Sequence, residues 1–434
     1  MRVQRPTFIA ISAIAAVIVA NGLNVGLSSS QFSTNYPAVV CPPTPANLTT
    51  AISLPSNKTQ LRLAGTKSLS FIPSQTLRYL QAKAPAIVES QGSTPIVWQI
   101  RKDVWAGATI CSSLQNEQWF VGGAADVTTR GRLIIVNSGL SDAVVDVVTF
   151  TENGKQPVRA TNVSSKNYIV IPIDSLAPGD KTLTVHVVPR SGRINAFMID
   201  EQGKGLKALG GDLVNPAVTA SKNVVIPAIP NQISKNTAAL PHTLRVLAPG
   251  DLDASITVEV VSADGVFVPV GLNSRTISAG VVSEFKLDPN ITSNLMAVRI
   301  SSTEPIVAAV KSTATVSGKK DFVWSTVAPE LVPLTMAITG LDPLITFTGE
   351  NIDVSLKVTL VNGKEVQQNV NGTDITNWRV PNNARSFTII KVGTGTFAGA
   401  LVSSANGYGY FPIAAGSLLT KIEVPDSNIR VLNP

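Results

Sequence analysis

Apolar and polar residues alternate along several stretches of the chain, and the stretches align as copies of one unit. LIIVNSGLSDAVVDVVTFTENGKQPV (133–158) aligns with LRVLAPGDLDASITVEVVSADGVFVPV (244–270), without a gap through Gly154 and Gly265, and NIDVSLKVTLVNGKEV (351–366) is a third copy. The alternating apolar positions are Val145 and Val147, then Ile256, Val258 and Val260, then Val354, Leu356, Val358 and Leu360. Alternation with a period of two predicts, in each copy, a strand with one face in a core.

A turn signal follows each of these strands. The pairs are Asn153-Gly154, Asp264-Gly265 and Asn362-Gly363. Such pairs tolerate positive φ and close tight hairpins. Three matching strand-and-turn signals predict a repeated β unit.

The second half of the unit also recurs. VHVVPRSGRINAFMI (185–199), VRISSTEPIVAAVKS (298–312) and IIKVGTGTFAGALVS (389–403) each predict a strand, a short turn and a second strand. VESQGSTPIVWQI (88–100) resembles them. We therefore expect a fourth, degenerate unit before residue 125.

An aromatic cluster follows the strand pair in three of the units. The clusters lie in NEQWFVGGAA (116–125), KKDFVWSTVAP (319–329) and NGYGYFPIAAG (406–416). LKALGGDLVNPA (206–217) has the glycines without the aromatics. We expect Trp119 and Phe120 to belong to the closing element of the N-terminal unit, packed in its core. The glycine pair Gly122-Gly123 leaves open a binding role for this copy.

Units of about 100 residues with many short strands favour an all-β fold of tandem immunoglobulin-like β-sandwiches over a propeller, whose blades are shorter. The expected divisions are a membrane segment (1–30), the degenerate β unit (31–125) and three sandwich repeats (126–235, 236–333 and 334–434). The Pro-containing linkers VVIPAIPNQISKN (224–236) and VAPELVP (327–333) predict a semi-rigid string of modules. SQTLRYLQAKAP (74–85) is the only helix candidate outside the N-terminus.

The N-terminus has the pattern of an export signal. Arg2 and Arg5 precede an apolar run from Phe8 to Ala20, which continues more weakly to Leu27. This pattern predicts either an uncleaved signal-anchor that contacts the membrane through residues 8–27 or a cleaved signal peptide. In both cases the rest of the chain is expected outside the cytoplasm, as a single-pass membrane protein or a secreted one.

Charge narrows the range of partners. Charged residues make up 15% of the 434 positions, and the net charge of +7 is spread in pairs such as Arg101-Lys102 and Lys319-Lys320. Nucleic-acid surfaces cluster Lys and Arg with stacking aromatics, so we expect no nucleic-acid partner. Mild attraction to anionic lipids or envelope polymers remains a functional interpretation of the charge.

Cys41 and Cys111 are the only cysteines. In an exported chain two cysteines most simply form one disulfide. Closing a loop of that length stabilises a fold by about 4 kcal/mol in the chain-entropy treatment. The alternative, a nucleophilic Cys111, needs a nearby base, and His186 and His242 are the only histidines.

Known catalytic and metal-binding patterns are weak or missing in the sequence. No acidic cluster adjoins either histidine, although a zinc site needs three or four ligands. No G-x-S-x-G elbow occurs, and the glycine-rich GTGTFAG (393–399) lies between predicted strands. We expect neither a cofactor nor a metal. A carboxylate pair that converges only in space, as in glycosidases, stays open.

Several segments together resemble a known family. ISAGVVSEFKLD (277–288), AVRISSTEPIVAAV (297–310) and DFVW (321–324) are similar to a family of actinobacterial large secreted proteins of unknown function. In that family repeated β domains follow an N-terminal membrane segment, and segments like Cys111 to Gly123 recur. The resemblance covers most of the chain after residue 85. It implies a place in the actinobacterial cell envelope or exterior and carries over no site residues.

The sequence therefore favours a structural or protein-interaction module of the cell envelope, without catalytic activity. The alternative is a protein that binds carbohydrate or another envelope polymer through exposed Trp98, Trp105 or Trp378. A secreted hydrolase with a carboxylate site comes third. Possible partners are envelope proteins or polysaccharide.

Overall fold

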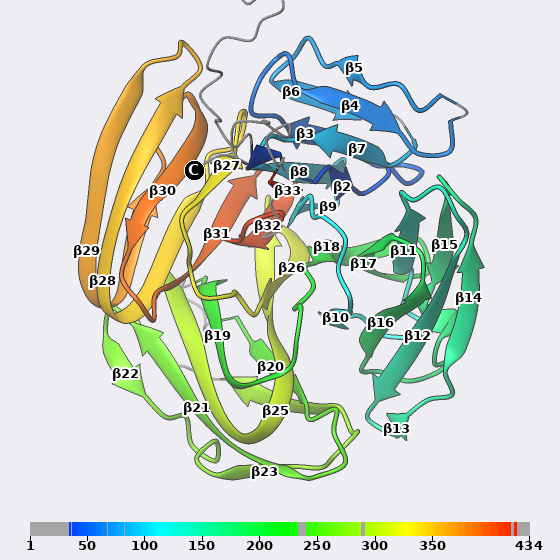
Figure 1. Cartoon of the computed structure of the whole chain (residues 1–434). Coiled ribbons are helices and arrows are strands. Elements are labelled where there is room, and N and C mark those ends of the chain that lie inside the picture. Colours follow the sequence, from blue (N-terminus) through cyan, green and yellow to red (C-terminus); the bar gives the residue numbers. More distant parts are fainter. Residues whose placement is uncertain are drawn as a thin grey trace, which may run out of the picture. The chain divides into compact units, whose positions relative to one another are not determined.

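The computed structural model describes residues 34–35, 37–66, 68–81, 83–232, 240–287, 291–417 and 421–422. The chain divides into two units. In the smaller one, β1 (Thr34–Asn35) pairs antiparallel with β33 (Lys421–Ile422). The larger one, Pro37–Leu418, holds all other strands (Figure 1). The predicted membrane segment at residues 8–27 lies outside the described residues, and none of the described residues forms a helix suited to crossing a bilayer.

The fold of the larger unit is all-β, as predicted, with one turn of 3-10 helix at Ile173–Ser175. Its strands form four successive groups, called here the first to fourth β units. The first β unit contains β2 (Val39–Cys41), β3 (Thr49–Ser53), β4 (Gln60–Leu63), β5 (Ile72–Pro73), β6 (Arg78–Gln81), β7 (Ala86–Glu89), β8 (Ser93–Arg101) and β9 (Trp105–Ile110). The second contains β10 (Gln118–Val121), β11 (Arg132–Asn137), β12 (Ala143–Thr151), β13 (Gly154–Lys155), β14 (Arg159–Val163), β15 (Tyr168–Pro172), β16 (Thr184–Ser191), β17 (Ile194–Lys204) and β18 (Lys207–Val214).

The third and fourth β units repeat this series with longer, fused strands. The third contains β19 (Ser221–Pro230), β20 (His242–Leu247), β21 (Ala254–Ser262), β22 (Gly265–Phe267), β23 (Arg275–Ile277), β24 (Ser283–Leu287), β25 (Leu295–Val316) and β26 (Lys319–Thr326). The fourth contains β27 (Leu334–Ala337), β28 (Leu344–Leu360), β29 (Glu365–Arg379), β30 (Ala384–Val392), β31 (Phe397–Ser404) and β32 (Gly407–Pro412).

The repeated strand-and-turn pattern is confirmed. In β12 and β21 the predicted apolar positions are buried and the intervening ones are partly exposed. Each strand then turns through a hairpin, with Thr151 opposite Gly154 and Ser262 opposite Gly265. Both glycines have positive φ, at 100° and 127°. As the sequence predicts, these glycines adopt the positive φ that the tight hairpin turns need.

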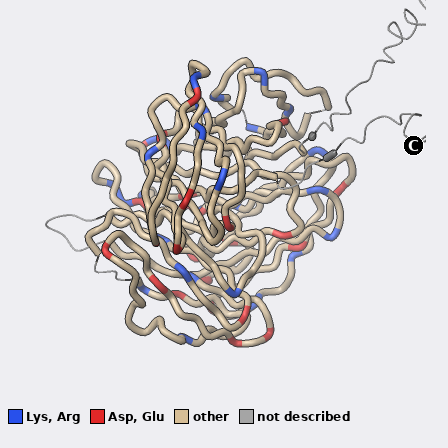
Figure 2. Tube along the Cα trace, turned by 60° about the vertical axis from the view of Figure 1, so that its left-hand side comes forward, with Lys and Arg blue, Asp and Glu red and all other residues tan. Residues whose placement is uncertain are grey.

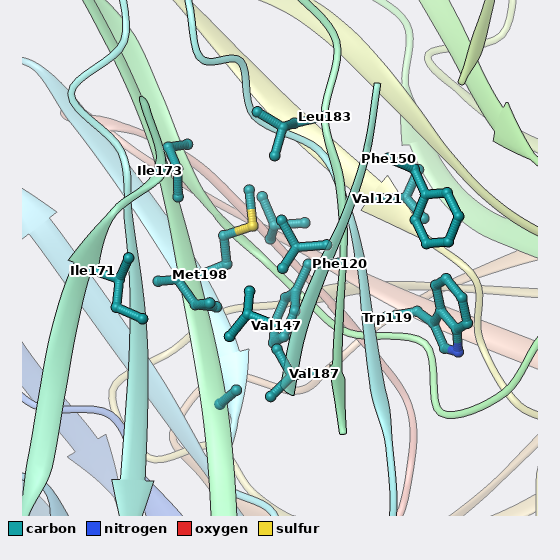
Figure 3. Packing of buried hydrophobic residues seen from close by; sticks show 14 of the residues in the cluster. Trp119, Phe120, Val121, Val147, Phe150, Ile171, Ile173, Leu183, Val187 and Met198 are labelled. Atoms are coloured by element: carbon teal, nitrogen blue, oxygen red, sulfur yellow. The ribbon is translucent and has the colours of Figure 1, made fainter. Parts of the chain in front are cut away.

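Two sheets enclose the core of the second β unit. One has the order β10-β16-β12-β13, with β14 also on β12, and the other has the order β15-β11-β17-β18. Phe120, Val147, Val187 and Met198 meet between them (Figure 3). The third β unit pairs its strands in the same way, except that the long β25 serves both sheets.

Strand pairing places two unit boundaries elsewhere than the sequence repeats suggest. β10, expected to close the N-terminal unit, pairs with β16 and so begins the second β unit. β19 covers much of the predicted linker 224–236 at the end of the predicted first repeat, but it is a strand that pairs with β25 and begins the third β unit. In the first β unit the closing position belongs to β9, which pairs with β8 and carries Trp105. The predicted end of the N-terminal unit differs from the observed one because Trp119 and Phe120 resemble the later aromatic clusters more closely than Trp105 does.

The closing strands of the four β units, β9, β18, β26 and β32, contact one another in a closed cycle. β9 contacts β18, β18 contacts β26, β26 contacts β32, and β32 returns to β9 (Figure 1). β27 of the fourth unit also pairs in parallel with β8 of the first. The expected semi-rigid string of modules is thus replaced by a ring, because buried apolar clusters continue from each unit into the next.

Glycines allow these four strands to approach at the centre of the ring. A Cβ at Gly407 would lie 2.5 Å from the backbone nitrogen of Ala106 and 2.6 Å from Asp321 Oδ2. A Cβ at Gly211 would lie 2.8 Å from Nε1 of Trp105. All three distances are shorter than an ordinary contact of a carbon atom. The close approach of these strands therefore requires glycine at positions 211 and 407.

Gly407→Ala is therefore expected to destabilise the larger unit by about 3 kcal/mol, since overpacking against backbone has no side chain that can move aside. Urea unfolding measures the effect. Gly250→Ala is the matched control, because a Cβ at Gly250 meets no atom within 4 Å. Equal stability of the two variants would contradict the close packing of β32 on β9.

The helix candidate at residues 74–85 is wrong. Its described residues contain the strand β6, which pairs with β3 from Thr50 opposite Gln81 to Ser53 opposite Arg78. Arg78 also donates through Nη1 to the carbonyl of Thr339, 2.8 Å away in the fourth β unit. Cross-strand and inter-unit contacts outweigh the local helix propensity here.

Candidate binding groove

A groove of ≈ 560 Å³ runs between the second and third β units. One wall comes from β10, β12 and β16 and includes Trp119, Phe150 and His186. The other comes from the loop Pro249–Leu252 and from Glu304–Pro305 in β25. This volume falls in the range of about 300–1,000 Å³ typical of small-ligand sites. The groove lies where the stretch EQWFVGGA (117–124) meets the next unit.

A stacked ring pair forms the floor of the groove. The rings of Trp119 and His186 lie 3.6 Å apart at an angle of 8°. Glu117 Oε2 accepts a hydrogen bond from Trp119 Nε1 at 3.2 Å and lies 2.7 Å from His186 Nε2. The carboxylate therefore holds the two rings parallel, one over the other. The arrangement follows from strand pairing, because Trp119 lies directly opposite His186 on β10 and β16.

Alternation along β10 separates structural from groove-facing side chains. Phe120 is fully buried and points into the core with Val147 and Val187, whereas Trp119 lies to the side with Phe150 (Figure 3). The expectation of core packing is met by both aromatics, because Trp119 and Phe120 belong to one buried cluster, which is that of the second β unit. Trp119 is 5% exposed and lines the groove.

The groove holds charges of both signs at its rim. Burial lowers the pKa of His186, although its hydrogen bond to Glu117 acts in the opposite direction. Lys155 places Nζ 5.8 Å from the ring centre of Phe150. Asp251 and Glu304 lie on the facing wall, and Leu252 there is 65% exposed. The floor is thus aromatic and the rim offers donors, acceptors and one apolar side chain.

The glycine pair beside Trp119 has a packing explanation. A Cβ at Gly122 would lie 2.9 Å from Val214 Cγ2, and one at Gly123 would lie 2.5 Å from Met198 Cε. Arg245 Nη1 donates to the carbonyls of Gly123 at 2.6 Å and Leu183 at 2.8 Å. These contacts attach the third β unit to the second behind the groove. The glycines serve this junction rather than a ligand loop.

The predicted ligand-contact tryptophans are not together. Trp98 is 4% exposed and packs with the fourth β unit, and Trp105 is fully buried among residues of the first and second. Neither ring offers a face to a ligand, because the ring of β units closes over them. Trp378 is partly buried on β29, where Nε1 donates to Gln368 Oε1 at 2.8 Å and the ring meets Phe387 edge-on. None of the three lines the groove.

The predicted disulfide between Cys41 and Cys111 is confirmed, with Cα atoms 4.5 Å apart. Both residues are fully buried. The bridge joins β2 to the end of β9, beside the antiparallel contact of Val40 with Ser112. It therefore fastens the start of the first β unit to the strand that closes it.

Three buried carboxyl groups lie at the junction of β17, β18 and β26. Trp324 donates from its backbone nitrogen to Asp212 Oδ2 at 2.7 Å and from Nε1 to Asp200 Oδ2 at 2.9 Å. Gly211 donates to Asp321 Oδ1 at 3.1 Å. Burial raises the pKa of Asp212 well above its ordinary value and raises that of Asp321 to about 7. No sequence pattern indicates this cluster, since its three carboxyl groups come from different strands and meet only in the fold.

The described residues contain no group of three or more His, Cys, Asp or Glu side chains placed to hold a metal. His242 is buried, with Nδ1 2.9 Å from Ser312 Oγ and Nε2 3.1 Å from Asn231 Oδ1. It therefore joins strands of the third β unit. The structure assigns the chain to a class of all-β proteins in which four interlocked units frame grooves at their junctions.

Comparison with known proteins gives the family. Residues 105–369 match the family of unknown function DUF5719, and because this is more than half of the chain, the protein belongs to that family. No curated protein matches the chain. A crystal structure of Thermotoga maritima 1070 is 14% identical and covers 23% of this chain and 92% of that one. Its TM-score of 0.21 is too low to inform the fold.

Proposed function

We propose that this protein is an extracytoplasmic interaction module of the cell envelope that holds a partner in the groove between its second and third β units and catalyses no reaction. The observation that carries the proposal is the groove itself, whose aromatic floor belongs to one β unit and whose opposite wall belongs to the next. Because Arg245 and shared core residues join the two units, the groove is preformed. Preformed sites bind without the cost of ordering their walls.

An extracytoplasmic location is supported by the disulfide and by the N-terminal sequence. Disulfides such as Cys41–Cys111 persist in oxidising compartments and are rare in the cytosol. The apolar run from Phe8 to Ala20 behind two arginines has the pattern of an export signal. The proposal includes one of two alternatives for residues 8–27, a single-pass anchor or part of a cleaved signal peptide. It also includes an actinobacterial source.

An immunoglobulin-like relationship of the four β units is also part of the proposal. In the second unit β11 pairs with β15 in one sheet and β12 pairs with β16 in the other. This matches the pairing of the four central strands, B with E and C with F, in immunoglobulin domains. The outer strands differ, because β10 lies beside β16 and β17 lies beside β11.

Carbohydrate is the second candidate ligand for the groove. Aromatic side chains are the surfaces on which sugar rings commonly stack, and Trp119, His186 and Phe150 line the groove, with Lys155 and Asp251 as hydrogen-bonding groups beside them. This observation moves the carbohydrate hypothesis from Trp98 and Trp105 to Trp119. An envelope protein and an envelope polysaccharide would then compete for one site.

Co-sedimentation of the purified full chain with isolated cell envelopes tests the proposal. Leu252→Asp is expected to weaken binding about tenfold, because it places a charge at the 65% exposed apolar rim position. Leu140→Asp is the matched control, since Leu140 is 72% exposed on the corresponding loop of the second β unit, outside the groove. Its binding should equal that of the unmodified chain.

Treatment of the envelopes separates the two ligands. Binding that disappears after protease digestion of the envelopes supports a protein partner. Binding that survives protease and is competed by soluble envelope polysaccharide supports carbohydrate. If the unmodified chain sediments with neither preparation, or if Leu252→Asp binds as well as Leu140→Asp, the groove is not the interaction site.

A further inference from the structure

Hairpin turns of three β units meet at one end of the ring. The turn between β8 and β9 contacts the turn between β25 and β26 through Lys319 Nζ, which donates to the carbonyl of Asp103 at 2.8 Å. Asp103 in turn donates from its nitrogen to Asn406 Oδ1 at 2.9 Å, in the turn between β31 and β32. We call the exposed residues of these turns, of the β17–β18 turn and of the loop Asp126–Arg130 the tip surface.

The β17–β18 hairpin extends beyond the other turns. Glu201 of β17 forms an ion pair with Arg101 at the end of β8, and Gly211, opposite Glu201, packs on Trp105. The hairpin then continues from Glu201 to Lys204, a rise of about 10 Å at the usual strand spacing. Leu206 lies at its turn and is therefore the most projecting residue of this hairpin.

Two fully exposed apolar side chains lie on the tip surface. Leu206 is 106% exposed and Val127 is 101% exposed. Their segments are joined, because Gly203 donates to the carbonyl of Thr128 at 2.8 Å and Arg130 donates to the carbonyl of Gly205. Isolated exposed aliphatic residues are common on proteins, so these two gain significance only from the basic side chains on the same turns and loop.

Basic side chains lie on the same turns and loop as these two residues. The exposed ones are Lys102, Arg130, Lys204, Lys207, Lys319 and Lys320. Asp103 is the only exposed acid in the same segments, and Asp126 is partly buried with Oδ1 bound to the nitrogen and hydroxyl of Thr128. Elsewhere on the described trace, acidic and basic positions are interspersed (Figure 2). The tip surface is therefore a local concentration of positive charge around an apolar point.

We propose that the tip surface docks on an anionic lipid bilayer, with Leu206 and Val127 entering the interfacial layer and the lysines contacting lipid headgroups. A bilayer accounts for both components of the surface, because apolar burial and attraction to anionic lipids act together in interfacial binding. A soluble polyanion would use the lysines and leave the two aliphatic side chains in water. Lys204 and Lys207 flank Leu206 on the paired strands and place their charges just behind it.

The described ends of the larger unit lie away from the tip surface. The larger unit begins near the far end of β9, where Val40 pairs with Ser112, and ends there too, where Ser113 donates to the carbonyl of Gly416 at 2.6 Å. β9 and β32 both run from the tip surface toward that end. The proposal is independent of the groove, which lies at the junction of the second and third β units, so either can fail alone.

An environment-sensitive fluorophore on the full chain tests the docking. The probe is attached to Leu206→Cys, and Val270→Cys is the matched control, because Val270 is 104% exposed and has no Lys or Arg within three residues. Both native cysteines are disulfide-bonded and do not react. On vesicles of phosphatidylcholine and phosphatidylglycerol in equal parts, the probe at 206 should shift to the blue and brighten about threefold. The probe at 270 should not change.

Charge and lipid composition complete the test. The response at 206 should disappear on pure phosphatidylcholine, at high salt, and in the background of Lys204→Glu with Lys207→Glu. Attachment of the chain to vesicles by other segments does not change this outcome, since the probe reports the surroundings of residue 206 itself. An unchanged probe at 206 on anionic vesicles overturns the proposal. Lysine-dependent binding of soluble polyphosphate in that case would identify a polyanion site instead.

Discussion

Loss of the Cys41–Cys111 disulfide is expected to lower the free energy of unfolding by about 4 kcal/mol, because the bridge closes a loop of 70 residues in the unfolded chain. It also holds β2 against the end of β9, where the first β unit begins and closes. Urea unfolding of the oxidised and reduced chain measures the difference.

Alanine variants provide the control for this prediction. Cys41→Ala and Cys111→Ala each remove the same bridge, so the double variant should differ from either single variant by no more than about 1 kcal/mol. Additive losses in the two single variants would mean that the thiols stabilise by packing alone. Oxidised and reduced protein of equal stability would show that the bridge does not constrain the unfolded state.

Stability is expected to fall as the pH rises from about 4 to about 7, because of Asp321. Burial raises the pKa of this carboxyl from 3.8 to about 7 in the folded chain. Between these values the folded state holds a proton that the unfolded state has released, so increasing pH favours unfolding. The shift corresponds to at most about 4 kcal/mol, since one pKa unit equals about 1.4 kcal/mol. Above pH 7 this contribution is constant.

Asp321→Asn isolates the contribution of this carboxyl. The amide oxygen can still accept the hydrogen bond from Gly211, but no charge forms at high pH. The variant should gain stability over the unmodified chain progressively between pH 4 and pH 7 in urea unfolding. Asp212, whose pKa is also raised by burial, leaves a residual slope of the same sign. Exposed Asp251→Asn is the control, and an identical pH profile for all three proteins would contradict the prediction.

Only part of the candidate groove can be predicted from sequence patterns. The sequence singles out Trp119 as an aromatic in a cluster with Phe120 and the glycine pair Gly122-Gly123, and the structure places it in the groove. The sequence places its partner His186 in a predicted strand, with no acidic cluster adjoining it in the sequence. Their stacking depends on the register of β10 on β16, whose residues are about 70 positions apart. No local pattern encodes such a register.

The sequence by itself determined the alternating strands of the repeated units and their hairpin turns, and it favoured the disulfide that the structure contains. Alternation in β12 and β21 and the glycines that follow are local properties, readable because strand faces repeat every second residue. The tertiary structure alone decided that the β units close into a ring, that Trp105 is buried and that the groove exists. Contacts such as Gly211 with Asp321 and Trp324 with Asp200 join residues more than 100 positions apart. They depend on shape complementarity between β units, which periodicity within one unit does not specify.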